Sequence, residues 1–197
     1  MAFPEHLRTA RLVLRRPVPA DAEPIFAGYA RDPEVSRYLT WRPHRSIDDT
    51  RSHIAYFSRL WEGGDRRSYV IVAEGCPCAG GIDLRWTDEG RSVTFGYVLR
   101  RDHWGRGLMT EALSACIEVA LADPGVWRAW AYCDVDNPAS GRVMEKAGMT
   151  FEGVLRRWAL HPNVDPRRPR DCRAYARVRT EPAAPGYDGT VRYGGTV

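Results

Sequence analysis

Long apolar stretches are absent from this 197-residue sequence, and so is the pattern of an export signal. No segment approaches the roughly 20 consecutive apolar residues that a helix needs to span a bilayer. The first residues, Met1 to His6, lack the charged and then apolar order of a secretory signal. The sequence therefore predicts no membrane segment, and we expect a cytoplasmic protein.

Cysteine is neither abundant nor even in number. Five cysteines in a chain long enough to bury a core without disulfides favour reduced thiols. Cys76 and Cys78 flank one proline, but no second Cys or Cys/His pair stands at a ligand spacing. We therefore expect no metal site, and we interpret residues 76–78 as a loop between strands.

Lysine is almost missing, because Lys146 is the only one, and arginine carries nearly all of the formal net charge of +4. The arginines are interleaved with acids and form no single basic face by simple periodicity. This disfavours nucleic acid as a partner. A solvated surface or an anionic cofactor explains the arginines equally well.

Length and composition indicate one globular domain. A chain of 197 residues with 44% hydrophobic and 27% charged residues has room for one full core and not for a second catalytic domain. The segment 181–197 is rich in Pro and Gly and has little apolar periodicity. We expect one domain over residues 1–180 and a flexible C-terminal tail over residues 181–197.

The apolar periodicity changes along the chain between about 3.6 and 2 residues, which predicts a mixed α/β fold. Helices are expected after Asp21 and after Ser46, where Ser46 and Asp49 resemble a capping box and Gly63-Gly64 ends the helix. Further helices are expected at 110–122 and 138–147. Strands are expected at 12–14, 69–73, 79–84, 93–99, 127–133, 149–155 and 173–179.

A glycine-containing turn joins the strand at 93–99 to the helix at 110–122. The first N–H groups of such a helix have no internal partner, and glycines at 105 and 107 let phosphate oxygens approach the backbone. The segment is neither the dinucleotide fingerprint nor a Gly-Lys-Ser/Thr phosphate loop, so nicotinamide and ATP chemistry are disfavoured. Taken alone, this Gly-x-Gly favours a tight turn before a helix over a phosphate site.

Two ordered motifs resemble the GNAT superfamily of N-acetyltransferases. The run from Trp104 to Ala112 resembles its acetyl-CoA pyrophosphate loop, in the form typical of the ribosomal-protein alanine acetyltransferase branch. About thirty residues later, Asn137-x-x-Ser140 and the segment 145–153 resemble the motif that follows the fifth strand of that family. On physical grounds alone, Asn137 is also a good helix cap. The resemblance covers most of residues 7–180.

The resemblance implies a fold and a cofactor site. The fold would be a single GNAT-like domain with a mixed, mostly antiparallel sheet of six to seven strands, splayed between the fourth and fifth strands, with helices on both faces. Acetyl-CoA would be the cofactor. Its pantetheine arm would contact Tyr97, the main chain of Val98 and Leu99, and Asn137. Its pyrophosphate would contact the loop Trp104, Gly105, Arg106, Gly107, Leu108, Met109 and Thr110. Asp102 departs from the Gln or Arg of many relatives, which affects one side-chain contact and not the backbone cradle.

The resemblance also implies direct attack of an amine on the thioester, with no covalent cysteine. Ser140 would protonate the leaving thiolate, and a backbone N–H near Val98, on a strand bulged around Gly96, would bind the oxyanion. The general base is not set by the motif, because Thr94 and Ala159 stand where some relatives have Glu. Candidates are Asp171, His161 and Asp83. An alternative is that Asp171 and His161 only order the Pro-rich loop at 161–170.

Which amine the site would acetylate depends on how easily that amine loses its proton. At pH 7, freeing a lysine amine costs about 4–5 kcal/mol, whereas freeing an α-amine costs about 1 kcal/mol. A site without a strong base therefore favours a protein or peptide N-terminus. A small-molecule amine is the alternative acceptor, and a nucleic-acid-binding module or a non-catalytic acetyl-CoA-binding regulator is an alternative of another class. Arginines in the 161–170 loop would suit an acidic peptide or an anionic molecule or face water, and the chain would act as a monomer or a homodimer.

Overall fold

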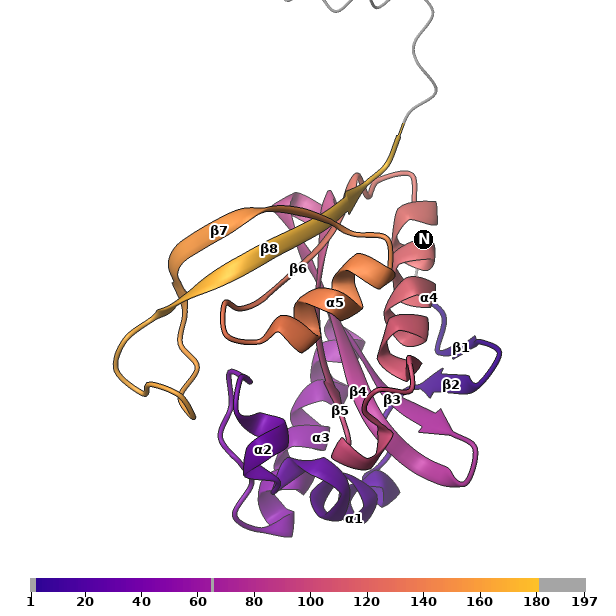
Figure 1. The fold of residues 1–197 in the computed structure, drawn as a ribbon. Coiled ribbons are helices and arrows are strands. Elements are labelled where there is room, and N and C mark those ends of the chain that lie inside the picture. The colour runs from indigo at the N-terminus through magenta and orange to yellow at the C-terminus, as the bar shows by residue number, and fades with distance from the viewer. Residues whose placement is uncertain (1–2, 65, 181–197) are drawn as a thin grey trace, which may run out of the picture.

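The structure is a computed structural model that describes residues 3–64 and 66–180 (Figure 1). The tail predicted at 181–197 lies outside the described residues. Within them, no helix has the length and apolar character needed to cross a membrane.

The centre of the fold is one eight-stranded sheet with the order β1-β2-β3-β4-β5-β6-β8-β7. Every pairing is antiparallel except β5 with β6, which is parallel. The strands are β1 (His6–Arg8), β2 (Leu12–Arg15), β3 (Arg66–Ala73), β4 (Cys76–Thr87), β5 (Ser92–Leu99), β6 (Arg128–Asp134), β7 (Thr150–Ala159) and β8 (Arg170–Val178).

The prediction of a mixed, mostly antiparallel sheet is confirmed, but the sheet has one strand more than the six to seven expected. The additional strand is β1, which pairs with β2 over three residues and is too short to show an apolar alternation. The interpretation of residues 76–78 as a loop was wrong. Cys76 already pairs with Ala73, because the turn at Glu74 and Gly75 is tight and Gly75 adopts a positive φ of 67°.

Helix boundaries follow the caps that the sequence contains. Ser46 and Asp49 form the predicted capping box of α3 (Ile47–Gly63), and Gly64 closes it with a φ of 89°. The helix predicted after Asp21 is instead several short segments. The helices are η1 (Pro19–Asp21), α1 (Ala22–Ile25), η2 (Phe26–Ala30), α2 (Pro33–Ser36), α3, η3 (Asp88–Gly90), η4 (Arg101–His103), α4 (Leu108–Ala122) and α5 (Pro138–Lys146).

Helices cover both faces of the sheet, as predicted (Figure 1). On one face, Leu113 and Ile117 of α4 join the larger apolar core with Ile71 and Val93 of the sheet. On the other face, α1 and η2 pack with Ile54 of α3 and with alternate residues of β3 and β4 in a second core. Alternate residues of a strand point to opposite faces of the sheet, so the strands contribute side chains to two separate cores.

The sheet opens between β5 and β6. These two strands pair only from Ser92 to Thr94, opposite Arg128 to Trp130, although each strand continues well beyond that point. Because β1 adds one strand, β5 and β6 are the fourth and fifth strands of the prediction, and the predicted splay is present. The bulge expected at Gly96 is absent from the pairing of β5 with β4, which keeps a single register along its length.

Candidate functional site

The opening between β5 and β6 leads into a cavity of about 680 Å³. Its walls come from segments far apart in the sequence: the α2 region, β5, the loop before α4, β6, α5 and the loop after β7. Arg37, Arg85, Arg142 and Lys146 contribute positive charge to the lining, against Glu34 and Asp136. The cavity therefore carries a cationic surplus that suits an anionic ligand.

The backbone of β5 offers hydrogen-bonding groups to this opening. Arg100 donates its N–H to the carbonyl of Ala79 at 2.9 Å, in the same register that pairs β5 with β4. Since antiparallel neighbours alternate between bonded and non-bonded pairs, Val98 bonds to β4, whereas the peptide groups of Tyr97 and Leu99 face the β6 side. Of the two residues expected to offer main-chain groups, Leu99 therefore presents its peptide groups to the opening, whereas those of Val98 are paired with β4. The side chain of Val98 still lines the cavity.

Tyr97 bridges the opening to α5 through its hydroxyl. The phenol oxygen lies 2.8 Å from Oγ of Ser140 and donates to the Ser140 carbonyl at 3.2 Å. Burial raises the pKa of the Tyr97 phenol well above its usual value, so the hydroxyl keeps its proton at neutral pH. Sequence reasoning placed Tyr97 beside the pantetheine arm and missed this hydroxyl pair, because no local pattern links residues 43 positions apart.

Asn137 is positioned as a helix cap at the wall of the cavity. Its Oδ1 accepts the N–H of Ser140 at 3.2 Å, and Pro138 occupies the first turn of α5. The capping interpretation is confirmed. Asn137 and Ser140 both line the cavity, so a pantetheine arm bound there could contact both residues, as the resemblance implies.

The loop before α4 forms an elbow with two left-handed glycines. Gly105 and Gly107 have φ values of 74° and 75°, and Gly107 is the N-cap of α4 without any side-chain hydrogen bond to the helix. Because glycine has no side chain, no N-cap side chain binds the first N–H groups of α4. Leu108, Met109 and Thr110 line the cavity with the two glycines. This arrangement is what a phosphate group requires.

Polar contacts from Thr9 and Arg11, in the turn between β1 and β2, form a clamp that holds the elbow from outside the cavity. Thr9 Oγ1 donates to Glu111 at 2.6 Å, and Arg11 binds the same carboxylate through its backbone N–H at 2.9 Å and its Nε at 2.7 Å. Arg11 also donates to the carbonyl of Arg106 at 3.0 Å. Arg106, one of the residues expected at the pyrophosphate, therefore lies outside the cavity lining and serves the clamp through its backbone.

Two further residues of the loop have roles of their own. Trp104 lines the cavity and donates its indole N–H to the carbonyl of Leu99 at 2.8 Å, which links the elbow to the end of β5. Asp102 instead binds Arg100 at 2.8 Å and His103 at 2.8 Å. Those hydrogen bonds lower the pKa of Asp102 to about 2, so its carboxylate is an internal anchor of the loop.

The three candidate bases are placed differently. His161 lines the cavity and is 2% exposed. Asp171 does not line it, because its Oδ1 accepts the backbone N–H of Arg157 at 2.9 Å. Asp83 is held by Arg66 at 2.6 Å and by further polar contacts, also away from the cavity lining. The structure thus brings only His161 of these three to the site.

The surroundings of His161 keep it neutral. Burial lowers the pKa of His161, and the carboxylate of Asp134, 3.8 Å from Nε2, offsets this only in part. Nδ1 is buried, and the backbone of Tyr38 and Leu39 beside the ring also raises the pKa of His161 without outweighing the effect of burial. Cys172 lies 3.7 Å from Nε2, but burial raises the pKa of its thiol to about 12, so a Cys–His nucleophile is disfavoured.

Comparisons with known proteins agree with this geometry. A family model described as an acetyltransferase (GNAT) domain matches residues 11–150. The chain is 30% identical over 181 residues to the uncharacterized N-acetyltransferase YoaA of Bacillus subtilis, covering 88% of this chain and 96% of that protein. It is 28% identical over 147 residues to the ribosomal-protein-serine acetyltransferase of Escherichia coli, covering 73% and 79%. The fold is similar to the crystal structure of the microcin C7 self-immunity acetyltransferase MccE in complex with acetyl-CoA and AMP, with a TM-score of 0.80, 20% identity and coverage of 90% and 98%.

Proposed function

This chain belongs to the GNAT acetyltransferase family and uses acetyl-CoA, and we propose that it acetylates the α-amine of a peptide or protein N-terminus by direct attack. One observation carries the proposal. The uncapped start of α4, the free edge of β5 and the Tyr97–Ser140 pair all face one cavity that also reaches His161.

The elbow and β5 would bind the donor. Diphosphate oxygens would accept hydrogen bonds from the N–H groups of residues 108–110, where the left-handed glycines leave the backbone accessible. The pantetheine arm would pair with the peptide groups of Tyr97 and with the N–H of Leu99, all of which face away from β4, while the Leu99 carbonyl accepts the indole N–H of Trp104. Arg142 and Lys146, which line the cavity, would add positive charge near the phosphates.

The reaction needs an unprotonated amine, an oxyanion donor and a proton for sulfur. His161 would take the proton that the amine releases as its nitrogen bonds to the carbonyl carbon. An N–H of Tyr97 or Leu99 would stabilise the oxyanion. As the carbon–sulfur bond breaks, the hydroxyl pair of Tyr97 and Ser140 would supply a proton to the thiolate.

The base supports the choice of an α-amine. His161 is a weak base whose pKa is lowered further by burial. Such a base suits an amine that costs about 1 kcal/mol to deprotonate at pH 7, and not a lysine that costs about 4–5 kcal/mol. The similarity to a ribosomal-protein-serine acetyltransferase supports the same class of acceptor.

A competition screen tests the acceptor class. The protein is incubated with acetyl-CoA and a peptide panel that offers free N-termini, lysines with blocked N-termini, or both, beside a panel of small amines. Intact mass and thiol release report the products. Faster acetylation of free N-termini supports the proposal. Faster acetylation of lysine ε-amines or of a small amine would replace it with the corresponding acceptor.

A further inference from the structure

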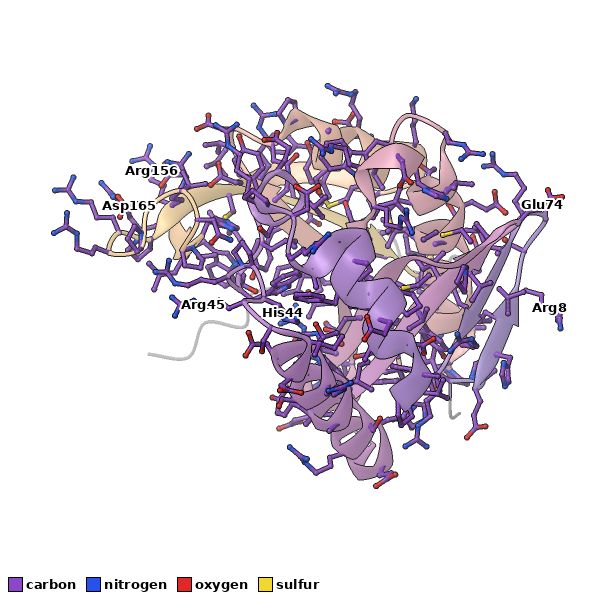
Figure 2. The ribbon with its side chains drawn as sticks, turned by 90° about the horizontal axis from the view of Figure 1, so that it is seen from below. Arg8, His44, Arg45, Glu74, Arg156 and Asp165 are labelled. Carbon is purple, nitrogen blue, oxygen red and sulfur yellow. The ribbon has the colours of Figure 1, made fainter. Side chains whose placement is uncertain are left out.

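One amide side chain ties together two loops at the same end of the cavity. Asn163 lies in the loop between β7 and β8, and its Nδ2 donates to the carbonyl of Ser36 at 2.7 Å and to the carbonyl of Trp41 at 2.8 Å. Figure 1 shows this loop descending toward α2, and Figure 2 shows its Asp165 on the same side of the molecule as His44 and Arg45.

The chemistry of this contact fixes its direction. Both partners are carbonyl oxygens, which only accept, so the NH2 group of Asn163 must face them and uses both of its hydrogens. The loop that carries Asn163 is itself well anchored. The N–H groups of Val164 and Asp165 both bond to the carbonyl of His161, at 2.9 and 3.0 Å, and prolines at 162, 166 and 169 restrict the chain.

The segment that Asn163 holds is a wall of the cavity. Tyr38, Leu39 and Thr40 line the cavity and lie between the two carbonyls that Asn163 binds. Residues 37–46 contain no helix or strand, so their position depends on contacts with other parts of the chain. The buried ring of His161 lies next to the backbone of Tyr38 and Leu39.

We propose that Asn163 is a positioning residue that fixes the width of the acceptor end of the cavity. The inference rests on the proposed function, because it assigns the wall between Ser36 and Trp41 to the acceptor side, beside the candidate base His161. The wall can move outward only if both hydrogen bonds of Asn163 break. Acceptors with a bulky group next to the amine are therefore excluded, and acceptors with a small group are accepted.

Asn163→Asp is the sharpest perturbation, because it keeps the shape of the side chain and turns a double donor into an acceptor that repels both carbonyls. Asn163→Ala removes the contact without adding charge and covers the case in which the Asp variant does not fold. Asp165→Asn is the matched control, since Asp165 caps only the N–H groups of Arg167 and Arg168 in the same loop.

Hydrogen exchange, acetyl-CoA titration and kinetics with peptides that begin with Gly, Leu or Trp separate the outcomes. In both Asn163 variants, exchange of residues 37–46 should accelerate by about tenfold, since two hydrogen bonds are lost. The preference for Gly over Trp should fall by about fivefold or more, with acetyl-CoA affinity within about twofold of the wild type. Asp165→Asn should change none of these quantities.

Unchanged peptide preference in a variant whose 37–46 segment exchanges faster would overturn the proposal, and so would exchange that does not change. Failure of the proposed function gives a different result. If no peptide is acetylated by the wild type, the α-amine acceptor is wrong, while the exchange measurement still decides whether Asn163 holds the wall.

Discussion

Replacing Gly107 with alanine should weaken acetyl-CoA binding in addition to a modest loss of stability in the fold. Gly107 sits at the N-cap of α4 with a φ of 75°, and a Cβ there would meet the Arg11 guanidinium only at an ordinary contact distance of 3.6 Å. The protein side therefore has room for the methyl group. The cost in the free protein comes from the left-handed backbone alone, about 1–2 kcal/mol.

That cost predicts a modest fall in thermal stability. For a domain of this size, 1 kcal/mol lowers Tm by about 2–4 °C, so Gly107→Ala should lower Tm by about 2–8 °C. The methyl group would also project where the phosphate approaches the backbone. Losing one hydrogen bond to a charged group costs about 1.5–3 kcal/mol, which raises the Kd for acetyl-CoA by about 10- to 150-fold.

Gly64→Ala is the matched control. Gly64 closes α3 with a φ of 89°, a Cβ added there would lie more than 4 Å from the described residues around it, and it does not line the cavity. It should show the same fall in Tm with an unchanged Kd. Calorimetry on both variants measures each quantity. An unchanged acetyl-CoA affinity in Gly107→Ala, or an equal loss in Gly64→Ala, would refute a phosphate site at the elbow.

Four further outcomes are expected. Tyr97→Phe and Ser140→Ala should each lower kcat by about 100-fold. The double variant should be little worse than either single variant, because the two hydroxyls act as one proton donor. Additive losses of kcat in steady-state kinetics would instead show that the two hydroxyls have separate roles. His161→Gln should lower kcat/KM at pH 7 by about 100-fold. Because burial lowers the pKa of His161, the His161-linked part of the stability should be lost only as the pH falls below 6.5, whereas the peptide amine titrates at higher pH and sets the acid limb of activity. The difference in stability between the wild type and His161→Gln measures the His161-linked part, and a loss of that part above pH 6.5 would contradict this. Asp171→Asn should leave kcat unchanged, because a carboxamide oxygen can still accept the N–H of Arg157, and a large kinetic loss would restore Asp171 as the base.

Local features of the chain were predictable because their causes are local. Ser46 and Asn137 each accept the backbone N–H of the residue three positions on, Asp49 accepts the N–H of Ser46 in return, and Pro138 has a φ already suited to the first turn of α5. The alternation of apolar residues in the meander is enough to give β3, β4 and β5. The glycine elbow could be located because left-handed glycines and an uncapped helix start need only a few adjacent residues.

The strand boundaries show where local reasoning fails. Residues 76–78 looked like a loop because of their proline, yet the pairing with β3 extends β4 to Cys76. β1 has only three residues and exists because β2 offers a partner. In both cases the ladder of hydrogen bonds with a neighbouring strand decides the conformation, and the neighbour is not encoded in the segment itself.

The sequence by itself determined the family, the donor and the elbow that would bind the diphosphate, since these depend on short runs of residue types. Only the tertiary structure decided which peptide groups of β5 face the opening, that His161 and not Asp171 reaches the cavity, and that Tyr97 meets Ser140. The register of a strand and the meeting of loops 122 and 127 residues apart, as at Asn163, follow from how the whole sheet packs. A one-residue change of register reverses which groups a strand presents, and no single segment of the chain fixes that register.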